Sequence, residues 1–264
     1  MPLNLERALF FSSYVPLDAL RHKPYLDLML GVGVILPTYR EAENISRLID
    51  DVESLNINST ILVIDDSSPD KTAEIVQAKQ EKYRNILLYV RPKKSGLGTA
   101  ITDGFKFFLN SNKPPKYVVT MDADYSHNPE DIPQLLSSMH ESECGIVIGS
   151  RYVKGGYTAN WPITRKVLSR VANSIARFSL RLKTRDCTSG FRIYSTKFLR
   201  AAIGNLHSHT YEIQIETIRQ ASLKRFDVKE SPILFVNRKN GKSKLSWTEI
   251  RSFITYTVKA TLPK

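Results

Sequence analysis

The chain has little cysteine and no long apolar segment. Its 264 residues include two cysteines, Cys144 and Cys187, which are too few for a disulfide framework or a four-ligand zinc site and fit a reducing compartment. No run of about 18 apolar residues is present, so we expect no transmembrane helix. Residues 8–20 are weakly apolar, but they lack a basic start and contain Pro16 and Asp18. We therefore expect no signal peptide.

Several familiar catalytic motifs are also missing. Gly241-Lys242-Ser243 resembles the end of a phosphate-binding loop, but no glycine lies five residues before it. Gly31-x-Gly33 precedes an apolar run instead of following one, which excludes a dinucleotide-binding fingerprint. The sequence contains no G-x-S-x-G nucleophile motif. Its five histidines show no zinc-binding spacing.

Acidic residues are the scarcer charged class. Lys and Arg number 38 against 26 Asp and Glu, which gives a formal charge of +12. Such an excess favours an anionic partner, which could be nucleic acid, an acidic membrane surface or a phosphorylated substrate. The alternative is a solvated basic surface without a specific ligand.

What is present is a regular alternation of apolar runs and helical periods. The runs predict strands and the segments between them predict helices, so we expect an α/β fold with a mostly parallel sheet covered by helices on both faces. The expected strands are 32–36, 60–64, 86–90, 117–121 and 145–149, and the expected helices are 43–52, 70–82, 98–109 and 129–139.

After Gly149 a long amphipathic helix is expected over 163–182. One face is basic and a separate stripe is apolar. Either the apolar stripe packs on the core and the basic face is solvated, or the basic face contacts an anionic partner. Because the basic face carries no aromatic side chain, we expect no nucleic-acid partner. The basic face consists of Lys166, Arg170, Arg177 and Arg181, and the stripe of Val167, Val171, Ile175, Phe178 and Leu182.

The chain closes with a strand-like segment, 226–236, a polar loop and a last helix over 247–262. The last helix has an apolar face that either packs on the domain or lies in a membrane interface. The face consists of Trp247, Ile250, Phe253, Ile254 and Val258.

Acidic and polar residues follow three of the expected strands. The first strand leads into Pro37–Glu41, the second into Asp65-Asp66-Ser67-Ser68, and the fourth into Asp122-Ala123-Asp124. In an open parallel sheet, ligands bind beyond the carboxyl ends of the strands. Carboxylates gathered there repel one another unless a cation joins them. Oxygen ligands suit Mg²⁺ or Mn²⁺, so we expect Asp122 and Asp124 to bind one of these metals.

A set of longer motifs gives the chain a family resemblance. PTYREAEN (37–44), IDDSSPDKT (64–72), GLGTA (96–100), MDADYSHNP (121–129), GSRYVKGG (149–156), TSGFRIY (188–194), YEIQIE (211–216) and RKNGKSK (238–244) occur in this order. Over about residues 32–262 the sequence resembles the dolichol-phosphate mannosyltransferases, which are inverting family 2 glycosyltransferases with the GT-A fold. The early motifs are shared by the whole GT-A superfamily. The blocks around Arg151, Arg192 and Lys244 narrow the resemblance to the polyprenyl-phosphate branch.

The resemblance implies a division into three parts and a set of site residues. Residues 1–31 form an extension of unknown role, 32–246 a single GT-A catalytic domain, and 247–264 the C-terminal amphipathic helix. Asp122 and Asp124 are implied as the metal ligands, and with Arg151 as the catalytic residues. Ser189 and Arg192 are implied to face the acceptor phosphate. The residues implied for the nucleotide sugar are Pro37, Tyr39, Glu41, Ile64, Asp66, Asp122, Ala123, Asp124, Arg151, Arg238 and Lys244.

The sequence departs from the family pattern at three positions. Lys71 stands where a glycine is usual, and Asn237 stands where an aspartate usually precedes the arginine. Ser126 occupies a position where some relatives place a metal-binding glutamine. The last departure leaves a third protein ligand for the metal open.

The activity implied by the resemblance is transfer of mannose from GDP-mannose to dolichyl or another polyprenyl phosphate, giving the lipid-linked mannose used in protein glycosylation or GPI-type pathways. A phosphate monoester is mostly a dianion at pH 7 and needs positive charge more than a general base. The net charge fits such an acceptor at the cytoplasmic face of a membrane, the endoplasmic reticulum if the cell is eukaryotic. Small membrane-anchoring subunits are left open as partners. The alternatives are a UDP-glucose-dependent enzyme of the same fold, a non-catalytic GT-A-like subunit and a nucleic-acid binder.

Overall fold

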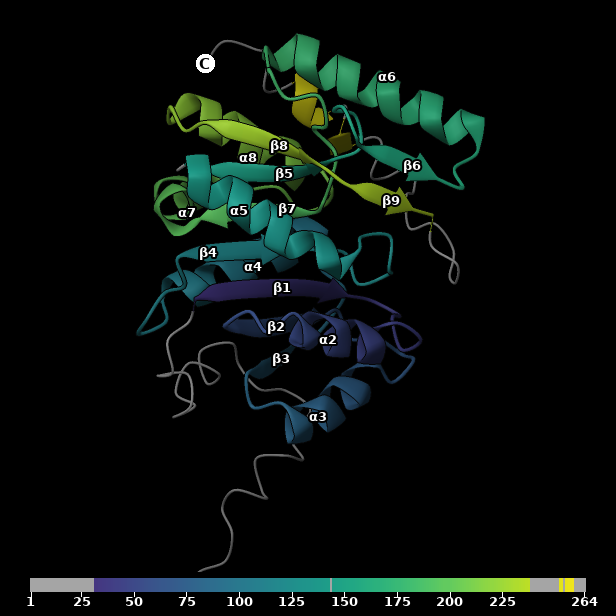
Figure 1. Cartoon of the computed structure of the whole chain (residues 1–264), viewed down its shortest axis with the longest axis vertical. Coiled ribbons are helices and arrows are strands. Elements are labelled where there is room, and N and C mark those ends of the chain that lie inside the picture. The colour runs from purple at the N-terminus through teal and green to yellow at the C-terminus, as the bar shows by residue number, and fades with distance from the viewer. Residues whose placement is uncertain (1–30, 143, 238–251, 254, 259–264) are drawn as a thin grey trace, which may run out of the picture.

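The computed structural model describes residues 31–142, 144–237, 252–253 and 255–258. Seven strands form the main sheet in the order β3-β2-β1-β4-β7-β5-β8 (Figure 1). All neighbouring strands run parallel except β7, which is antiparallel to β4 and β5. The strands are β1 (Val32–Thr38), β2 (Ser59–Asp65), β3 (Ile86–Val90), β4 (Tyr117–Thr120), β5 (Ile146–Ser150), β7 (Arg192–Ser195) and β8 (Val228–Pro232). The mostly parallel sheet is confirmed.

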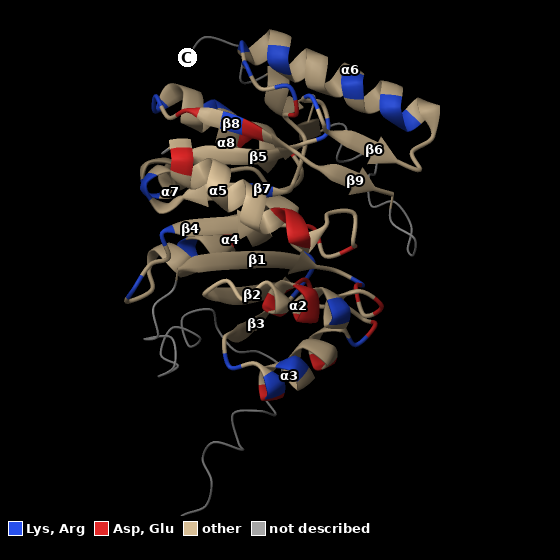
Figure 2. Cartoon of the chain, viewed as in Figure 1, with Lys and Arg blue, Asp and Glu red and all other residues tan. Residues whose placement is uncertain are grey.

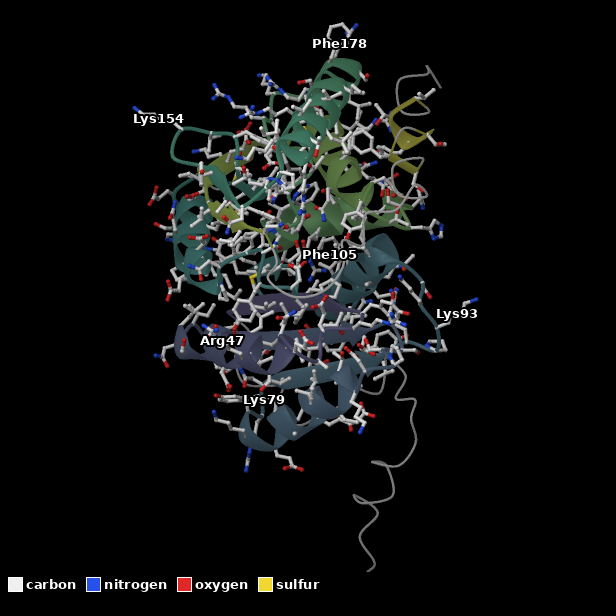
Figure 3. All side chains as sticks on the ribbon, turned by 90° about the vertical axis from the view of Figure 1, so that its right-hand side faces the viewer. Arg47, Lys79, Lys93, Phe105, Lys154 and Phe178 are labelled. Atoms are coloured by element: carbon white, nitrogen blue, oxygen red, sulfur yellow. The ribbon has the colours of Figure 1, made fainter. Side chains whose placement is uncertain are left out.

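Helices cover both faces of this sheet. Alternate side chains of β1 enter different cores: Ile35 faces one, while Val34 and Leu36 face the other. The first core is closed by α4 (Leu97–Leu109), α7 (Thr196–Ala202) and α8 (Ile213–Leu223), and Phe105 of α4 lies near the centre of the molecule (Figure 3). The second is closed by α2 (Ile45–Ser54), α3 (Thr72–Lys82) and α5 (Ile132–Ser142). Short 3₁₀ turns precede α5 (η3, Pro129–Asp131) and follow α7 (η4, Ile203–Asn205).

A small two-stranded sheet stands apart from the main one. It pairs β6 (Tyr157–Ala159) with β9 (Leu234–Val236) in parallel, next to the long helix α6 (Ile163–Leu180) (Figure 1). Neither β6 nor the antiparallel strand β7 was expected from the sequence. Both are short, and β7 begins with a charged residue, so neither forms a continuous apolar run.

Helix α6 does not bury its apolar stripe. Only Asn173 and Ala176 of this helix are buried, and Leu182, just beyond its end, is also buried. The rest of the stripe is solvent-exposed, from 46% for Ile175 to 89% for Phe178. Lys and Arg recur along the helix (Figure 2), and Phe178 lies at the outer end of the molecule (Figure 3). The interpretation of α6 as a core helix with a basic back is therefore wrong.

The described part of the last helix packs on the domain. Phe253 and Tyr256 pack against the first core, and Thr257 is buried. Val258 is exposed. Trp247, Ile250 and Ile254, and residues 1–30 of the extension, lie outside the described residues. Among the helices that are described, none has the length and apolar character needed to cross a membrane.

Candidate active site

The ends of β1, β2 and β4 meet at one edge of the sheet. These strands are parallel neighbours, and Thr38 at the end of β1 pairs in register with Asp65 at the end of β2. The Thr38 hydroxyl donates a 2.9 Å hydrogen bond to the Asp65 carboxylate, which also accepts from the Ser68 backbone at 2.8 Å. Asp65 is fully buried. Asp65 therefore links the end of β1 to the loop after β2, and its buried carboxylate is not accessible to a ligand.

Asp66 is turned toward the loop before α4. Its carboxylate pairs with Arg91 at 2.5 Å and accepts from the backbone nitrogens of Ser95 and Gly96 at 3.2 and 3.3 Å. Arg91 also donates to the Gly96 carbonyl at 2.9 Å. The sequence analysis missed Arg91, although it directly follows a strand at the same edge. Asp66 thus anchors the loop that borders the site, and contact with a nucleoside stays a prediction.

The other residues expected around the nucleoside differ in accessibility. Tyr39 is partly exposed, with Lys94 Nζ 4.2 Å from its ring centre, and Pro37 is partly exposed as well. Glu41 is buried and accepts from Asn44 Nδ2 at 2.9 Å. Ile64 is fully buried in the core. The Ile64 side chain therefore packs in the core, and contact of this residue with a nucleoside stays a prediction.

Lys71 shows why a glycine is usual at its position. It precedes α3 with φ of 65°, in the left-handed region that favours glycine. Asp70 holds the turn by accepting from the Thr72 hydroxyl at 2.6 Å and from the Ala42 backbone at 3.1 Å. Burial would raise the pKa of Asp70, but these hydrogen bonds lower it below its ordinary value. The chain thus tolerates the strained residue because the surrounding bonds fix the turn.

Asp122 and Asp124 follow β4 at the same sheet edge. The Asp122 side chain is 34% exposed. Asp124 accepts from the Ser126 backbone at 3.0 Å, across a turn in which Tyr125 has φ of 57°. Ala123 is buried between them. The turn places both carboxylates where a diphosphate could approach.

The buried ring of His127 packs beneath this turn, on the side facing the core. Its ring lies 5.2 Å from Phe191 and 5.1 Å from Phe235, between ring centres. Burial lowers the pKa of His127 to about 4, so the ring is neutral at pH 7. Its Nδ1 accepts from the Asp122 backbone at 3.3 Å, so Nε2 carries the proton. The 3.9 Å approach of Nδ1 to the Asp122 carboxylate is therefore not an ion pair.

The donor set fits a hard divalent cation held mainly by substrate. In the part of the chain that the structure describes, no group of three or more His, Cys, Asp or Glu side chains could hold a metal. Asp122 and Asp124 supply carboxylate oxygens, and Mg²⁺ or Mn²⁺ commonly binds one or two carboxylates together with phosphate oxygens and water. Ser126, the open third position, is buried and its hydroxyl has no hydrogen-bond partner.

Arg151 is held in a buried ion pair. Its Nε and Nη2 bind the two oxygens of Asp186 at 2.7 and 2.6 Å, and Nη2 also donates to Thr188 at 2.7 Å. Burial would lower the pKa of Arg151, but Asp186 raises it. Trp161 lies beside this guanidinium at 5.4 Å, and Arg165 covers the same ring at 4.2 Å. The sequence analysis missed Asp186 and Arg165, since a pair so distant in sequence leaves no local pattern.

Arg192 lies away from solvent, against expectation. It is fully buried and donates to the Ser189, Cys187 and Gln214 carbonyls, at 2.7, 2.9 and 2.5 Å, and to the Thr217 hydroxyl at 2.9 Å. With these bonds made, its guanidinium cannot also face an acceptor phosphate, so that expectation is corrected: Arg192 joins the 187–189 loop to α8. Ser189 is buried too. Arg238 and Lys244 lie outside the described residues.

Comparison with known families accounts for this edge of the sheet. The model of glycosyl transferase family 2 matches residues 33–202, which includes all three strand ends. The chain belongs to this family. As a family 2 glycosyltransferase, it carries Asp65, Asp66, Asp122 and Asp124 within the residues that the family model spans.

Two curated relatives of this family 2 chain are similar over most of their length. A polyprenol monophosphomannose synthase of Mycolicibacterium smegmatis is 38% identical over 221 residues, 83% of this chain and 82% of the relative. An undecaprenyl-phosphate mannosyltransferase of Micrococcus luteus is 36% identical over 219 residues, 82% of this chain and 88% of the relative.

Solved structures support the fold of this family 2 chain at lower identity. Glucosyl-3-phosphoglycerate synthase of Mycobacterium tuberculosis, in complex with Mn²⁺, uridine diphosphate and glucosyl-3-phosphoglycerate, is 15% identical with a TM-score of 0.62. The match covers 93% of this chain and 82% of that one. The same enzyme with phosphoglyceric acid gives a TM-score of 0.65 at 16% identity, covering 95% and 86%. The expected GT-A fold is confirmed.

Proposed function

We propose that this family 2 glycosyltransferase moves mannose from GDP-mannose to a polyprenyl phosphate, dolichyl phosphate at the endoplasmic reticulum if the cell is eukaryotic. The observation that carries the proposal is that both similar relatives are named for mannose and a polyprenyl lipid. The Asp122 and Asp124 carboxylates at the sheet edge are consistent with it.

Asp122 and Asp124 would hold Mg²⁺ or Mn²⁺ at the diphosphate. When bound, the metal neutralises charge that develops on the leaving diphosphate. His127 holds Asp122 by accepting from its backbone N–H, and the Ser126 backbone N–H holds Asp124 by donating to its carboxylate. The protein therefore contributes a prepared pair of carboxylates at a fixed turn, which is the arrangement that orients a leaving group.

The acceptor supplies its own nucleophile. A phosphate oxygen of the lipid attacks the anomeric carbon, the bond to the diphosphate breaks, and attack from the opposite side inverts the configuration. The dianion needs positive charge nearby. Because Arg192 is committed elsewhere, we assign this role to Arg165, with the charge of Arg151 beside it across Trp161. Asp186 offsets part of the Arg151 charge.

Helix α6 would bring the enzyme to the membrane that carries the lipid. The helix exposes apolar side chains to solvent on one face, and its basic side chains lie on the neighbouring face. Interfacial helices have this distribution, because apolar side chains enter the acyl boundary while basic ones meet anionic headgroups. The exposed apolar residues are Ile163, Val167, Leu168, Val171, Ile175 and Phe178. Peripheral binding through α6 is therefore part of the proposal.

One assay tests the activity. The purified chain is incubated with Mn²⁺, a polyprenyl phosphate and either GDP-mannose or UDP-glucose, and the lipid is analysed by mass spectrometry. We expect mannosyl phosphate lipid and release of GDP. Glucosyl lipid from UDP-glucose alone would replace the donor assignment, and no sugar transfer from either donor would contradict the enzymatic role.

Asp124→Asn tests the metal site in the same assay. We expect transfer to fall by at least about 10²-fold at saturating Mn²⁺, since a neutral amide holds the cation poorly and each tenfold loss corresponds to about 1.4 kcal/mol of transition-state stabilisation. Asp227→Asn, at an exposed carboxylate before β8, is the matched control. Near-normal turnover of Asp124→Asn would exclude this metal site.

A further inference from the structure

Gln214 carries an unpaired amide inside the protein. It lies in the first turn of α8 and is only 2% exposed. Neither its Nε2 nor its Oε1 has a hydrogen-bond partner in the structure. Burying an amide without partners is unfavourable, and native proteins leave few such groups unless a site uses them. The feature therefore calls for a ligand that can both donate and accept.

The amide borders the same space as a proposed metal ligand. A β-carbon placed on Gly190 would lie 3.2 Å from Asp122 Oδ1 and 3.5 Å from Gln214 Nε2. Because residue 190 is glycine, no side chain separates the carboxylate from the amide. The neighbouring Ser189 hydroxyl is also buried without a partner. Asp122, which follows β4, and Gln214 of α8 thus both lie next to Gly190, and Ser189 directly precedes it.

Arg192 holds this arrangement together. Its Nη1 binds the backbone carbonyl of Gln214 and its Nε binds that of Ser189, at 2.5 and 2.7 Å. The loop and the first turn of α8 are thereby fixed to one buried guanidinium. These bonds fix the backbone from which the Ser189 and Gln214 side chains extend, and a binding site requires such preorganisation.

The position in the sheet indicates which part of a donor would lie here. The residues expected at the nucleoside follow β1 and β2, while Asp122 follows β4 and Gly190 precedes β7. The strands lie in the order β2-β1-β4-β7. If the nucleoside lies at β1 and β2 and the diphosphate meets the metal at β4, the sugar extends toward β7 and α8.

We infer that Gln214 binds a hydroxyl group of the transferred sugar. The inference rests on the proposed function for its donor. An amide offers one donating and one accepting atom, which matches a sugar hydroxyl, and a buried pairing discriminates against analogues that lack that hydroxyl. Gln214 is thus a specificity-determining residue, positioned by Arg192.

Calorimetry on the whole chain with Mn²⁺ tests the inference. The dissociation constants of GDP-mannose and GDP are compared in the wild type, in Gln214→Met and in the control Gln220→Met. Gln220 lies on the same helix and is also buried, with one 3.4 Å bond to the Asn205 carbonyl. We expect Gln214→Met to weaken GDP-mannose about tenfold, the order of one or two buried hydrogen bonds, with GDP unchanged. The control should change neither.

A series of GDP-deoxymannoses, each lacking one hydroxyl, locates the contact. One GDP-deoxymannose should bind the wild type about tenfold more weakly than GDP-mannose does. Its affinity for Gln214→Met should be no lower than its affinity for the wild type. If Gln214→Met does not fold, Gln214→Asn keeps the amide but withdraws it, and should give an intermediate loss. Equal effects on GDP-mannose and GDP, or additive losses for every deoxy sugar, would overturn the inference.

The proposed function can fail separately. If the wild type transfers only glucose from UDP-glucose, the donor assignment falls, and the same comparison is made with UDP-glucose and UDP. If the ratio of the dissociation constants of UDP-glucose and UDP is the same in Gln214→Met as in the wild type, Gln214 does not bind the sugar. A changed ratio would support binding of glucose by Gln214.

Discussion

Two arginines are buried in this protein in different ways. Arg151 is neutralised by the Asp186 carboxylate, which binds it through two oxygens. Arg192 is instead held by hydrogen bonds to three carbonyls and a hydroxyl. A buried charge is tolerated only when its donors are satisfied. Both residues therefore stiffen the loops that border the site.

The Arg151–Asp186 pair predicts a pH-dependent contribution to stability. Burial would raise the pKa of Asp186, but the attraction of Arg151 lowers it below its ordinary 3.8. A lowered pKa in the folded state means that the pair stabilises above about pH 4 and loses its effect as the pH falls. Asp186→Asn should therefore reduce the free energy of unfolding by about 3–5 kcal/mol at pH 7, because Arg151 is left unpaired.

Urea unfolding from pH 7 downward measures this effect. The gap between wild type and Asp186→Asn should narrow below pH 4, by about 1 kcal/mol at pH 3. Asp227→Asn, at an exposed carboxylate, is the control and should lie close to the wild type throughout. A gap that stays constant down to pH 3 would contradict the lowered pKa of Asp186.

At the scale of elements, α4 lies unusually close to β1. A β-carbon on Gly104 would come within 2.6 Å of the Ile35 side chain, and one on Gly33 within 2.8 Å of Phe108. The two elements thus interlock, with each glycine receiving a large side chain from the other. This contact positions the start of α4 beside the loop that Asp66 anchors.

Gly104→Ala should destabilise the protein although it lies inside a helix. Alanine favours helices over glycine by about 1 kcal/mol, but the methyl would overlap Ile35. Overpacking a core costs about 1–3 kcal/mol, so we expect a net loss. Thermal unfolding measures it, with Gly204→Ala as the control because no atom lies within 4 Å of its added β-carbon. Ile35→Val in the Gly104→Ala background should recover part of the loss; no recovery would refute the overlap.

At the scale of the molecule, six of the ten exposed large hydrophobic side chains among the described residues lie on α6. Most of its large apolar side chains are exposed, and Phe178 lies at the outer end of the molecule (Figure 3). The nearby small sheet also exposes Tyr157 and Leu234, at 58% and 48%. Arg165, assigned to the acceptor phosphate, lies on the same helix. Docking by this end would therefore bring the phosphate of a membrane lipid to the site.

Phe178→Asp tests this orientation. Burying a phenylalanine side chain contributes about 1.5–3 kcal/mol, so we expect at least about tenfold weaker sedimentation with anionic vesicles. Leu223→Asp, at an exposed leucine of α8, is the control and should bind as the wild type does. Transfer to a short, water-soluble polyprenyl phosphate should be unaffected in Phe178→Asp. Unchanged vesicle binding would remove α6 from the membrane interface.

The alternation of strands and helices, the acidic strand ends and the family resemblance can all be predicted from the amino-acid sequence. These depend on short-range features: apolar runs long enough to form strands, and residues directly after them that must meet at one sheet edge. The position of Asp122 and Asp124 at this edge is therefore predictable from the sequence, and their binding of a metal stays a prediction.

The surroundings of Arg192 and of the apolar stripe of α6 depend on long-range packing, which short-range patterns do not reveal. The carbonyls of Cys187, Ser189 and Gln214 bind Arg192 only after the loop and α8 have packed together, so the sequence favoured a charged residue facing a ligand. An amphipathic period likewise shows that a helix has two faces, but not which one the rest of the chain covers. In α6 the domain packs against Asn173 and Ala176 and leaves the larger apolar side chains outside.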